Sequence, residues 1–252
     1  MSSPVVTDLR CSVQSRSLGE LPGGSATSAD RFILVELPTP WPASIEDHPM
    51  VAEVIATGPT HDVTRILGIR GGSETPNGDE EAVRKILVYR KMPGQPFTRF
   101  AGFEATFGTD RLAKGLADAY SGDLAGFTPI EVDPRHPTES TLDVLICTHG
   151  SRDRCCGQAG SLLFLELADR LPDNVRLWRA SHTGGHRFAP TGISFPDGLT
   201  WAFLDGHLLS GIISRTLDPA ALSSHLRGCA GFEGVEQVAD AAAFGQVGWD
   251  WL

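Results

Sequence analysis

Two cysteines and two histidines on two short segments of this chain could bind a metal. Cys147 and Cys156 lie nine positions apart in C-T-H-G-S-R-D-R-C-C-G (147–157), and His182 and His186 flank a glycine pair in H-T-G-G-H. Thiolate and imidazole are the ligands that hold zinc or an iron–sulfur cluster in proteins. The glycine pair would let the backbone turn tightly and direct both imidazoles towards one metal ion. The residues therefore predict a metal site, with zinc and an iron–sulfur cluster both open at this point.

Other residues of the same segments compete for a role. Cys155 is adjacent to Cys156, but the spacing and the following glycine favour Cys156, because a helix starting there would lower the pKa of its thiol. His149 makes half of a Rieske pattern whose other half is missing, so we expect it to order its loop by hydrogen bonds. A thiol oxidoreductase using Cys155 or Cys156 is a weaker hypothesis, because the chain has no C-x-x-C motif. Cys229 is expected to be structural, and the role of Cys11 stays open.

Two predicted strands would bring the four ligands together. T-L-D-V-L-I-C (141–147) reads as a strand that ends at Cys147, and V-R-L-W-R-A-S (175–181) as a strand that delivers His182. The segment between them, 158–171, has the apolar spacing of a helix. Because a right-handed β-α-β unit makes the two strands parallel neighbours, both ligand segments should emerge at the same edge of a sheet.

The remaining elements predict an α/β (α+β) chain of two domains. Downstream, we expect 199–205 and 207–214 to be two strands paired around Gly206, which completes the element order of a thioredoxin-like domain. Upstream, the pattern predicts a strand-rich α/β domain, and prolines at 129, 134 and 137 indicate a linker. The predicted domains are therefore 1–135 and 136–252. The predicted elements not yet mentioned are strands at 31–37, 63–70, 85–91 and 97–107 and helices at 48–56, 111–120, 218–227 and 235–244.

Composition limits the classes of function. The chain has 252 residues and a formal net charge of −10 at pH 7. This charge disfavours nucleic-acid binding, which requires clustered Lys and Arg, and is compatible with docking a basic partner such as a flavin reductase. No apolar run reaches the roughly 18 residues of a membrane span, and the N-terminus lacks the apolar core of a signal peptide, so we expect a cytoplasmic protein without a membrane span. The five cysteines do not form a secreted disulfide framework.

The ligand segments resemble the sucrase/ferredoxin-like family, a branch of the thioredoxin-like 2Fe–2S ferredoxins. The resemblance is carried by C-T-H-G-S-R-D-R-C-C-G and R-A-S-H-T-G-G-H-R-F-A-P-T. Cys11-Ser12 with R-F-I-L-V-E-L-P-T-P-W-P looks like the N-terminal segment of the family. L-R-G (226–228) and V-E-Q-V-A-D-A-A-A (235–243) look like its C-terminal end. In that family a cysteine pair nine positions apart and an H-x-x-x-H pair hold the cluster. The matching positions are Cys147, Cys156, His182 and His186.

The resemblance implies an electron-transfer protein with a 2Fe–2S cofactor. It would receive single electrons from a reductase and pass them to a downstream acceptor, with ferric siderophore reduction as one use. By analogy with Rieske centres, histidine ligation raises the reduction potential from about −400 mV into a range of roughly −150 to +300 mV. Whether the chain is an enzyme stays open, and no carboxylate pair for sucrase chemistry can be identified. The alternative is a structural or regulatory zinc protein that uses the same four ligands.

Overall fold

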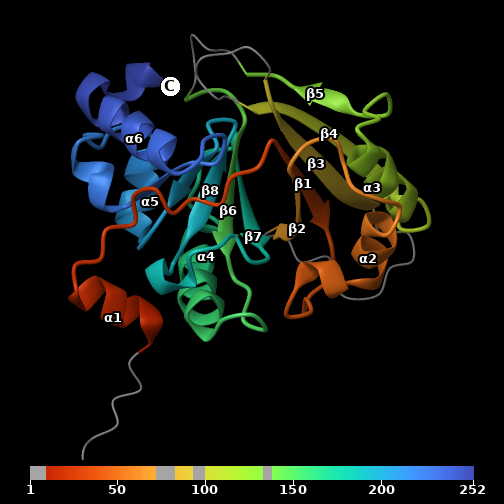
Figure 1. Cartoon of the computed structure of the whole chain (residues 1–252), viewed down its shortest axis with the longest axis horizontal. Helices are drawn as coiled ribbons and strands as arrows, with labels where there is room; N and C mark the ends of the chain where they lie inside the picture. Colours follow the sequence, from red (N-terminus) through yellow and green to blue (C-terminus); the bar gives the residue numbers. More distant parts are fainter. Residues whose placement is uncertain (1–9, 72–82, 93–99, 133–137) are drawn as a thin grey trace, which may run out of the picture.

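The protein is described here by a computed structural model that covers residues 10–71, 83–92, 100–132 and 138–252. In these residues the strands form one mixed sheet in the order β10-β9-β8-β6-β7-β2-β1-β3-β4-β5 (Figure 1). The first five strands in the chain build one half of the sheet and the last five build the other, which confirms the α/β class. The strands are β1 (Arg31–Glu36), β2 (Thr64–Gly71), β3 (Val83–Lys91), β4 (Phe100–Gly108), β5 (Thr128–Ile130), β6 (Leu142–Cys147), β7 (Val175–Ala180), β8 (Gly192–Phe195), β9 (Leu199–Trp201) and β10 (Leu226–Cys229).

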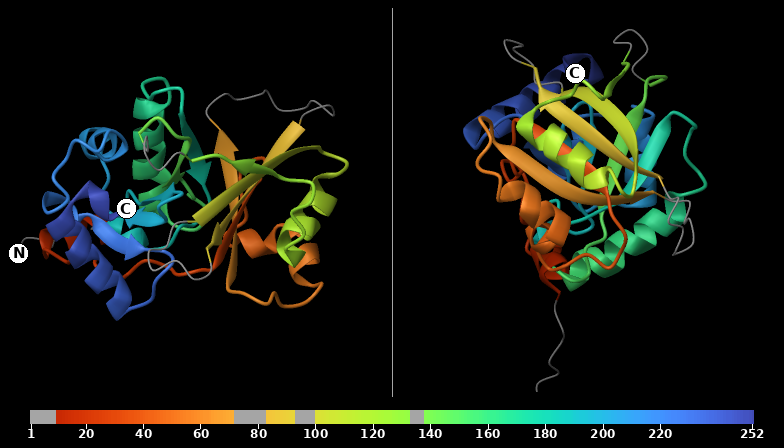
Figure 2. Two further views of the ribbon diagram at one scale, coloured as in Figure 1. Left: turned by 90° about the horizontal axis from the view of Figure 1, so that it is seen from above. Right: turned by 90° about the vertical axis from the view of Figure 1, so that its right-hand side faces the viewer.

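Helices cover the two halves of the sheet separately (Figure 2). α2 and α3 pack on the N-terminal half through a core that includes Val51, Leu112 and Leu116. α4, α5 and α6 pack on the C-terminal half through a second core. The helices are α1 (Cys11–Ser17), α2 (Pro49–Ile55), α3 (Leu112–Ser121), α4 (Ser161–Leu167), α5 (Gly206–Ile213) and α6 (Val235–Val247), with short turns η1 (Ile45–Asp47), η2 (Cys156–Gly160), η3 (His186–Phe188), η4 (Ala221–Ser224) and η5 (Trp249–Trp251).

The predicted β-α-β unit is present. β6 pairs with β7 in parallel, with Cys147 opposite Ala180, and α4 connects the two strands. β8 pairs antiparallel with the other side of β6, and β9 pairs antiparallel with β8. Because β6 and β7 are parallel neighbours, both ligand segments leave the sheet at one edge, as the sequence predicts.

The sheet curls so that its two halves share a third core. Tyr89 on β3 stacks on Phe195 of β8 with ring centroids 4.3 Å apart, although four strands separate β3 from β8. Phe32 contacts the same Phe195 ring edge-on at 5.1 Å. This core is continuous from one half to the other. The predicted domain boundary at 135/136 lies outside the described residues, and the two-domain division stays a prediction.

Two predicted elements after β9 are wrong. The segment predicted as a strand at 207–214 is helix α5, because the Asp205 carboxylate accepts a hydrogen bond from the Leu208 N–H at 2.8 Å and caps it. Its apolar residues at 208, 209, 212 and 213 also follow helical spacing. The strand paired with β9 is instead β8, which the sequence interpretation missed. The helix predicted at 218–227 is reduced to the short turn η4, after which the chain enters β10.

None of the helices described is long and apolar enough to cross a membrane.

Candidate metal centre

Cys147 and Cys156 are in direct contact beneath the edge of the sheet. Cys147 is the last residue of β6, and Cys156 begins the short π-helix η2 that leads into α4. Both side chains are fully buried, in a small cluster with Cys155 and Ala189. The turn approaches the strand so closely that a Cβ atom on Gly160 would lie 1.9 Å from the Cys147 carbonyl oxygen. Glycine at this position therefore allows the two cysteines to meet.

The two thiols share a proton unequally. A hydrogen bond from Cys156 lowers the pKa of Cys147 well below its ordinary value, and the His182 side chain and the N–H groups of His149 and Thr183 act in the same direction. The same hydrogen bond and burial raise the pKa of Cys156. The prediction that Cys156 is the low-pKa thiol is thus wrong in this structure. The physical reason is that Cys147 accepts all of these hydrogen bonds, while the charge of Asp153 raises the pKa of Cys156.

His182 lies beside the thiol pair, and its ring has an unused nitrogen. It follows β7 directly, and its half-buried side chain interacts with Cys147. Its Nδ1 atom is buried and has no hydrogen-bond partner among the described residues. Such an orphaned atom is costly unless something else binds it.

His186 lies farther out, at the start of η3, and is exposed. The imidazole centroids of His182 and His186 are 6.2 Å apart. Among the described residues, no three His, Cys, Asp or Glu side chains form a group that could hold a metal ion. The structure thus brings Cys147 into contact with Cys156 and with His182, and leaves His186 at the surface.

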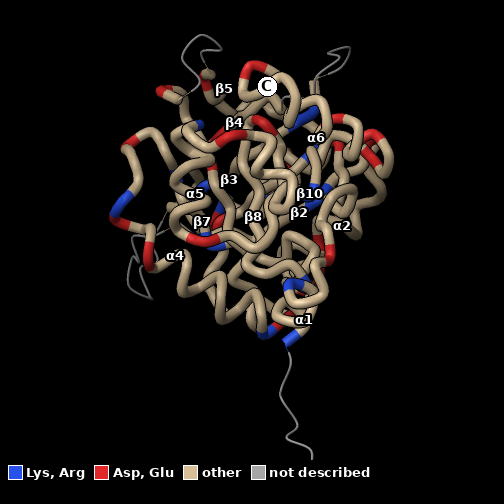
Figure 3. The backbone as a smooth tube through the Cα atoms, turned by 90° about the vertical axis from the view of Figure 1, so that its left-hand side faces the viewer, with Lys and Arg blue, Asp and Glu red and all other residues tan. Residues whose placement is uncertain are grey.

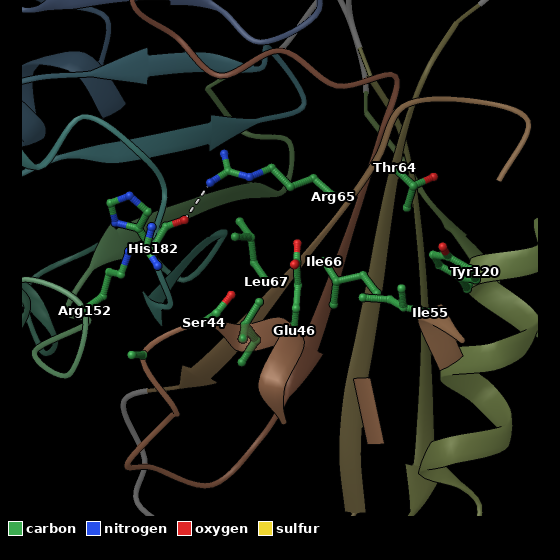
Figure 4. Close-up of a pocket in the computed structure, with 12 residues that line it drawn as sticks. Ser44, Glu46, Ile55, Thr64, Arg65, Ile66, Leu67, Tyr120, Arg152 and His182 are labelled. Carbon is green, nitrogen blue, oxygen red and sulfur yellow. Dashed lines mark hydrogen bonds between the residues drawn. The ribbon is translucent and has the colours of Figure 1, made fainter. Parts of the chain in front are cut away.

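Two arginines that the sequence interpretation missed hold the loop between the histidines. Arg227 of β10 is 1% exposed and donates to the Gly184 carbonyl oxygen at 3.1 Å. Arg65 of β2 donates to the His182 carbonyl oxygen at 2.6 Å, as Figure 4 shows, and to that of Thr183 at 3.3 Å. For Arg65 the available signal was an arginine inside an apolar segment predicted as a strand, which is a rare placement for a charged residue. Arg227 fell at the end of a segment predicted as a helix, so no such signal was available for it.

The glycine pair of this loop permits both the tight turn and the close approach of the Arg227 side chain. Gly184 and Gly185 have φ angles of +88° and +68°, a left-handed conformation that favours glycine. A Cβ atom on Gly185 would also lie 2.5 Å from the Arg227 guanidinium carbon. The predicted tight turn is therefore present, and its second glycine leaves room for a buried cation.

His149 orders the ligand loops, as expected. Its Nε2 lies 2.7 Å from the Pro42 carbonyl oxygen, and its Nδ1 accepts a hydrogen bond from the His182 N–H at 3.0 Å. Burial lowers the pKa of this imidazole, which is consistent with a neutral ring that donates through one nitrogen and accepts through the other. Asp153 acts similarly on the other loop, because its Oδ1 accepts from the N–H groups of Cys155 at 2.8 Å and Cys156 at 3.2 Å.

The remaining three cysteines differ in burial and in their distance from the thiol pair. Cys155 is buried and borders a cavity of about 500 Å³ beneath α1. Cys11 is exposed on α1, and Cys229 is buried on β10, 3.5 Å from the Asp197 carbonyl oxygen. None of the five cysteines forms a disulfide.

A cavity of about 360 Å³ opens beside His182 (Figure 4). Arg65 and Arg152 border it near the histidine, and Thr64 and Tyr120 border it at the far end. The cavity lies between the ligand loops of the C-terminal half and the α2 and α3 layer of the N-terminal half. It gives solvent a route to the histidine side of the site.

Two buried thiols and two histidines that follow the carboxyl ends of two parallel strands give this α/β protein a candidate metal centre. A model of the sucrase/ferredoxin-like family matches residues 22–228, and the chain belongs to that family. A stretch of 58 residues is 40% identical to Altered inheritance of mitochondria protein 32 from Meyerozyma guilliermondii. That match covers 21% of this chain and 21% of the relative, so the chain spans about a fifth of the length of the curated protein it matches. No solved structure matches the chain.

Proposed function

We propose that this protein transfers single electrons through a 2Fe–2S cluster bound by Cys147, Cys156, His182 and His186. The observation that carries the proposal is the contact of the buried Cys147 thiol with both Cys156 and His182, together with the buried Nδ1 of His182, which has no partner among the described residues. Two sulfur and two imidazole ligands form a donor set that iron–sulfur clusters use. A cluster of this kind supplies one-electron redox chemistry when bound.

The residues of the site have different roles in holding the proposed cofactor. Cys147 and Cys156 give up their shared proton and bind as thiolates, in a pocket from which burial excludes water. His182 binds through a ring nitrogen while its backbone is fixed by His149 and Arg65. The exposed His186 forms the outer side of the site, where a partner protein can approach.

The partners we propose are a reductase that supplies the electron and a downstream acceptor, which could be a ferric siderophore. Figure 3 shows acidic and basic residues interspersed along the chain, with several basic residues close to α1. Around His186, Arg187 pairs with Glu20 at 2.7 Å, and Arg16 of α1 lies 4.7 Å from the centre of the Phe203 ring. The surface at the outer histidine is thus less acidic than the net charge of the chain suggests.

Aerobic purification followed by metal and sulfide analysis tests the proposal. We expect a brown-red protein with two irons and two acid-labile sulfides per chain and an EPR signal after reduction with dithionite. A colourless protein with one zinc per chain would contradict the proposal and support the zinc alternative.

A histidine-to-cysteine change tests the ligand assignment. The variant His186→Cys should keep a cluster but lower its reduction potential, because a thiolate adds negative charge where a neutral imidazole stood. The matched control is His207→Cys, at an exposed histidine on α5, which should leave the potential unchanged. Equal potentials for wild type and His186→Cys would remove His186 from the ligand set.

A further inference from the structure

Two arginines donate hydrogen bonds to the histidine loop without forming an ion pair among the described residues. Arg227 donates to Gly184 and to the hydroxyl and carbonyl oxygens of Ser25, with the hydroxyl at 3.2 Å. Arg65 donates to the carbonyl oxygens of His182 and Thr183. Within the part of the chain that the structure describes, neither forms an ion pair, although the carboxylate of Glu46 lies close enough to favour the charged form of Arg65.

Carbonyl groups alone do not explain why these positions carry a charge. A neutral glutamine, with two N–H donors, could donate to some of these oxygens without the free-energy cost of burying an unpaired cation. Burial lowers the pKa of both guanidinium groups to about 10, so both remain charged at neutral pH. Both guanidinium groups donate to carbonyl oxygens of the loop that carries His182 and His186. The two cations are therefore held beside two of the proposed ligands.

We propose, building on the function proposed above, that Arg65 and Arg227 are positioning residues whose fixed positive charges favour the reduced state of the site. Two thiolates and two bridging sulfides balance the charge of two ferric ions. Reduction then adds one electron from the reductase, and hence one negative charge that needs compensation. Charges fixed in a buried, low-dielectric site compensate it more effectively than water-exposed charges do. The same hydrogen bonds hold the histidine loop in place.

Paired substitutions separate charge from hydrogen bonding. Arg227→Gln and Arg65→Gln keep a donor but remove the charge, and Arg227→Lys and Arg65→Lys keep the charge in another shape. The control is Arg31→Gln, because Arg31 is 4% exposed but pairs with Asp62 at 2.5 Å, away from the ligand loops. The midpoint potential is measured by dithionite titration followed by EPR, together with iron and sulfide content.

We expect each glutamine variant to lower the equilibrium constant for reduction by at least tenfold, about 59 mV for one electron. The lysine variants and Arg31→Gln should stay close to the wild type. Glutamine variants that carry full iron and sulfide and keep the wild-type potential would overturn the proposal, leaving the arginines as clamps only.

If a glutamine variant loses iron, the lysine variant at the same position shows whether the lost charge is the cause. A lysine variant that loads iron with a near wild-type potential supports the role of charge. A lysine variant that also fails to load, or loads with the lowered potential, overturns it. Failure of the wild-type protein to contain iron and sulfide would instead defeat the function proposed above.

Discussion

The molecule buries arginine in two different ways. Arg176 of β7 pairs with Asp143 at 2.6 Å and with Glu104, and Asp143 also accepts from Tyr89 and from Trp178 at 2.6 Å. These five residues form a carboxylate network at the core that both halves share. The arginines of the histidine loop have backbone carbonyls and a serine as partners instead.

The difference shows in the pKa of each guanidinium. Burial favours the neutral form of Arg176, but the hydrogen bonds and charge of Asp143 raise its pKa above the ordinary value. Burial lowers the pKa of Arg227 to about 10, with no carboxylate among the causes of its shift. Charge in the carboxylate network is therefore compensated by direct ion pairs, while no carboxylate contributes to the shift of Arg227 at the histidine loop.

The largest expected effect is the loss of metal binding, without loss of folding, when a ligand thiol is removed. In Cys147→Ser the iron content should fall to less than about a tenth of wild type, because a hydroxyl is a poor substitute for a thiolate ligand. Metal analysis after identical purification measures this. Cys155→Ser is the neighbouring control and should keep its iron. The reverse result would make Cys155 the ligand.

Breaking the carboxylate network should instead lower the stability of the fold and leave metal binding unchanged. In Asp143→Asn the buried Arg176 loses its main counter-charge, so the free energy of unfolding should fall by about 3 to 5 kcal/mol. Urea unfolding followed by tryptophan fluorescence measures it, with the exposed pair variant Asp118→Asn as a control expected to change little. A visible spectrum that changes while stability does not would invalidate the contrast between the two regions.

The space kept for Arg227 can be tested at a glycine. Gly185→Ala and Gly19→Ala both place a methyl group at a positive φ, but only Gly185 has the guanidinium within 2.5 Å of the added atom. The difference in unfolding free energy between the two variants should be about 1 to 3 kcal/mol, the usual cost of overpacking. Equal losses in urea unfolding would mean that Arg227 moves aside freely.

The smallest expected effect concerns the ion pair between Arg31 and Asp62, which lies outside both regions. Burial raises the pKa of Asp62, but hydrogen bonds from Thr64 and Arg31 and the charge of Arg31 lower it more, so the net shift is downward. Stability from this carboxylate is thus present above its unfolded pKa of about 3.9 and is lost as the pH falls through the lower folded value. At pH 7, Asp62→Asn should be less stable than wild type by on the order of 1 kcal/mol. In urea unfolding from pH 7 to pH 2 this difference should disappear at the acidic end, and a constant difference would contradict the assignment.

The ligand strands could be predicted because their signals are local. The apolar run ending at Cys147 and the run ending before His182 define β6 and β7, and parallel pairing then fixes the shared edge. The strands β1 to β4 also follow the predicted segments closely within the described residues. The strand predicted at 207–214 was wrong because the helical spacing of its apolar residues and the capping role of Asp205 were overlooked.

The rest of the site depends on contacts between distant segments. The roles of Arg65 and Arg227 become visible only when β2 and β10 are placed against the histidine loop. The order of the thiol pKa values depends first on which sulfur accepts the hydrogen bond from the other thiol, and then on the hydrogen bonds from His182, His149 and Thr183. No spacing pattern in the sequence encodes either relation.

The segment before β1 has a consequence for how the protein is made. Ser25 and Ala29 donate backbone hydrogen bonds to the carbonyl oxygens of Arg227 at 3.1 Å and Ala230 at 3.0 Å, so the segment before β1 lies against β10 and the residue that follows it. During synthesis this segment leaves the ribosome long before β10, because Ser25 precedes Arg227 by 202 positions. The histidine loop therefore receives its buried cation from Arg227 only after β10 has been made, and a fragment beginning at residue 136 would lack Ser25, which accepts two hydrogen bonds from that arginine.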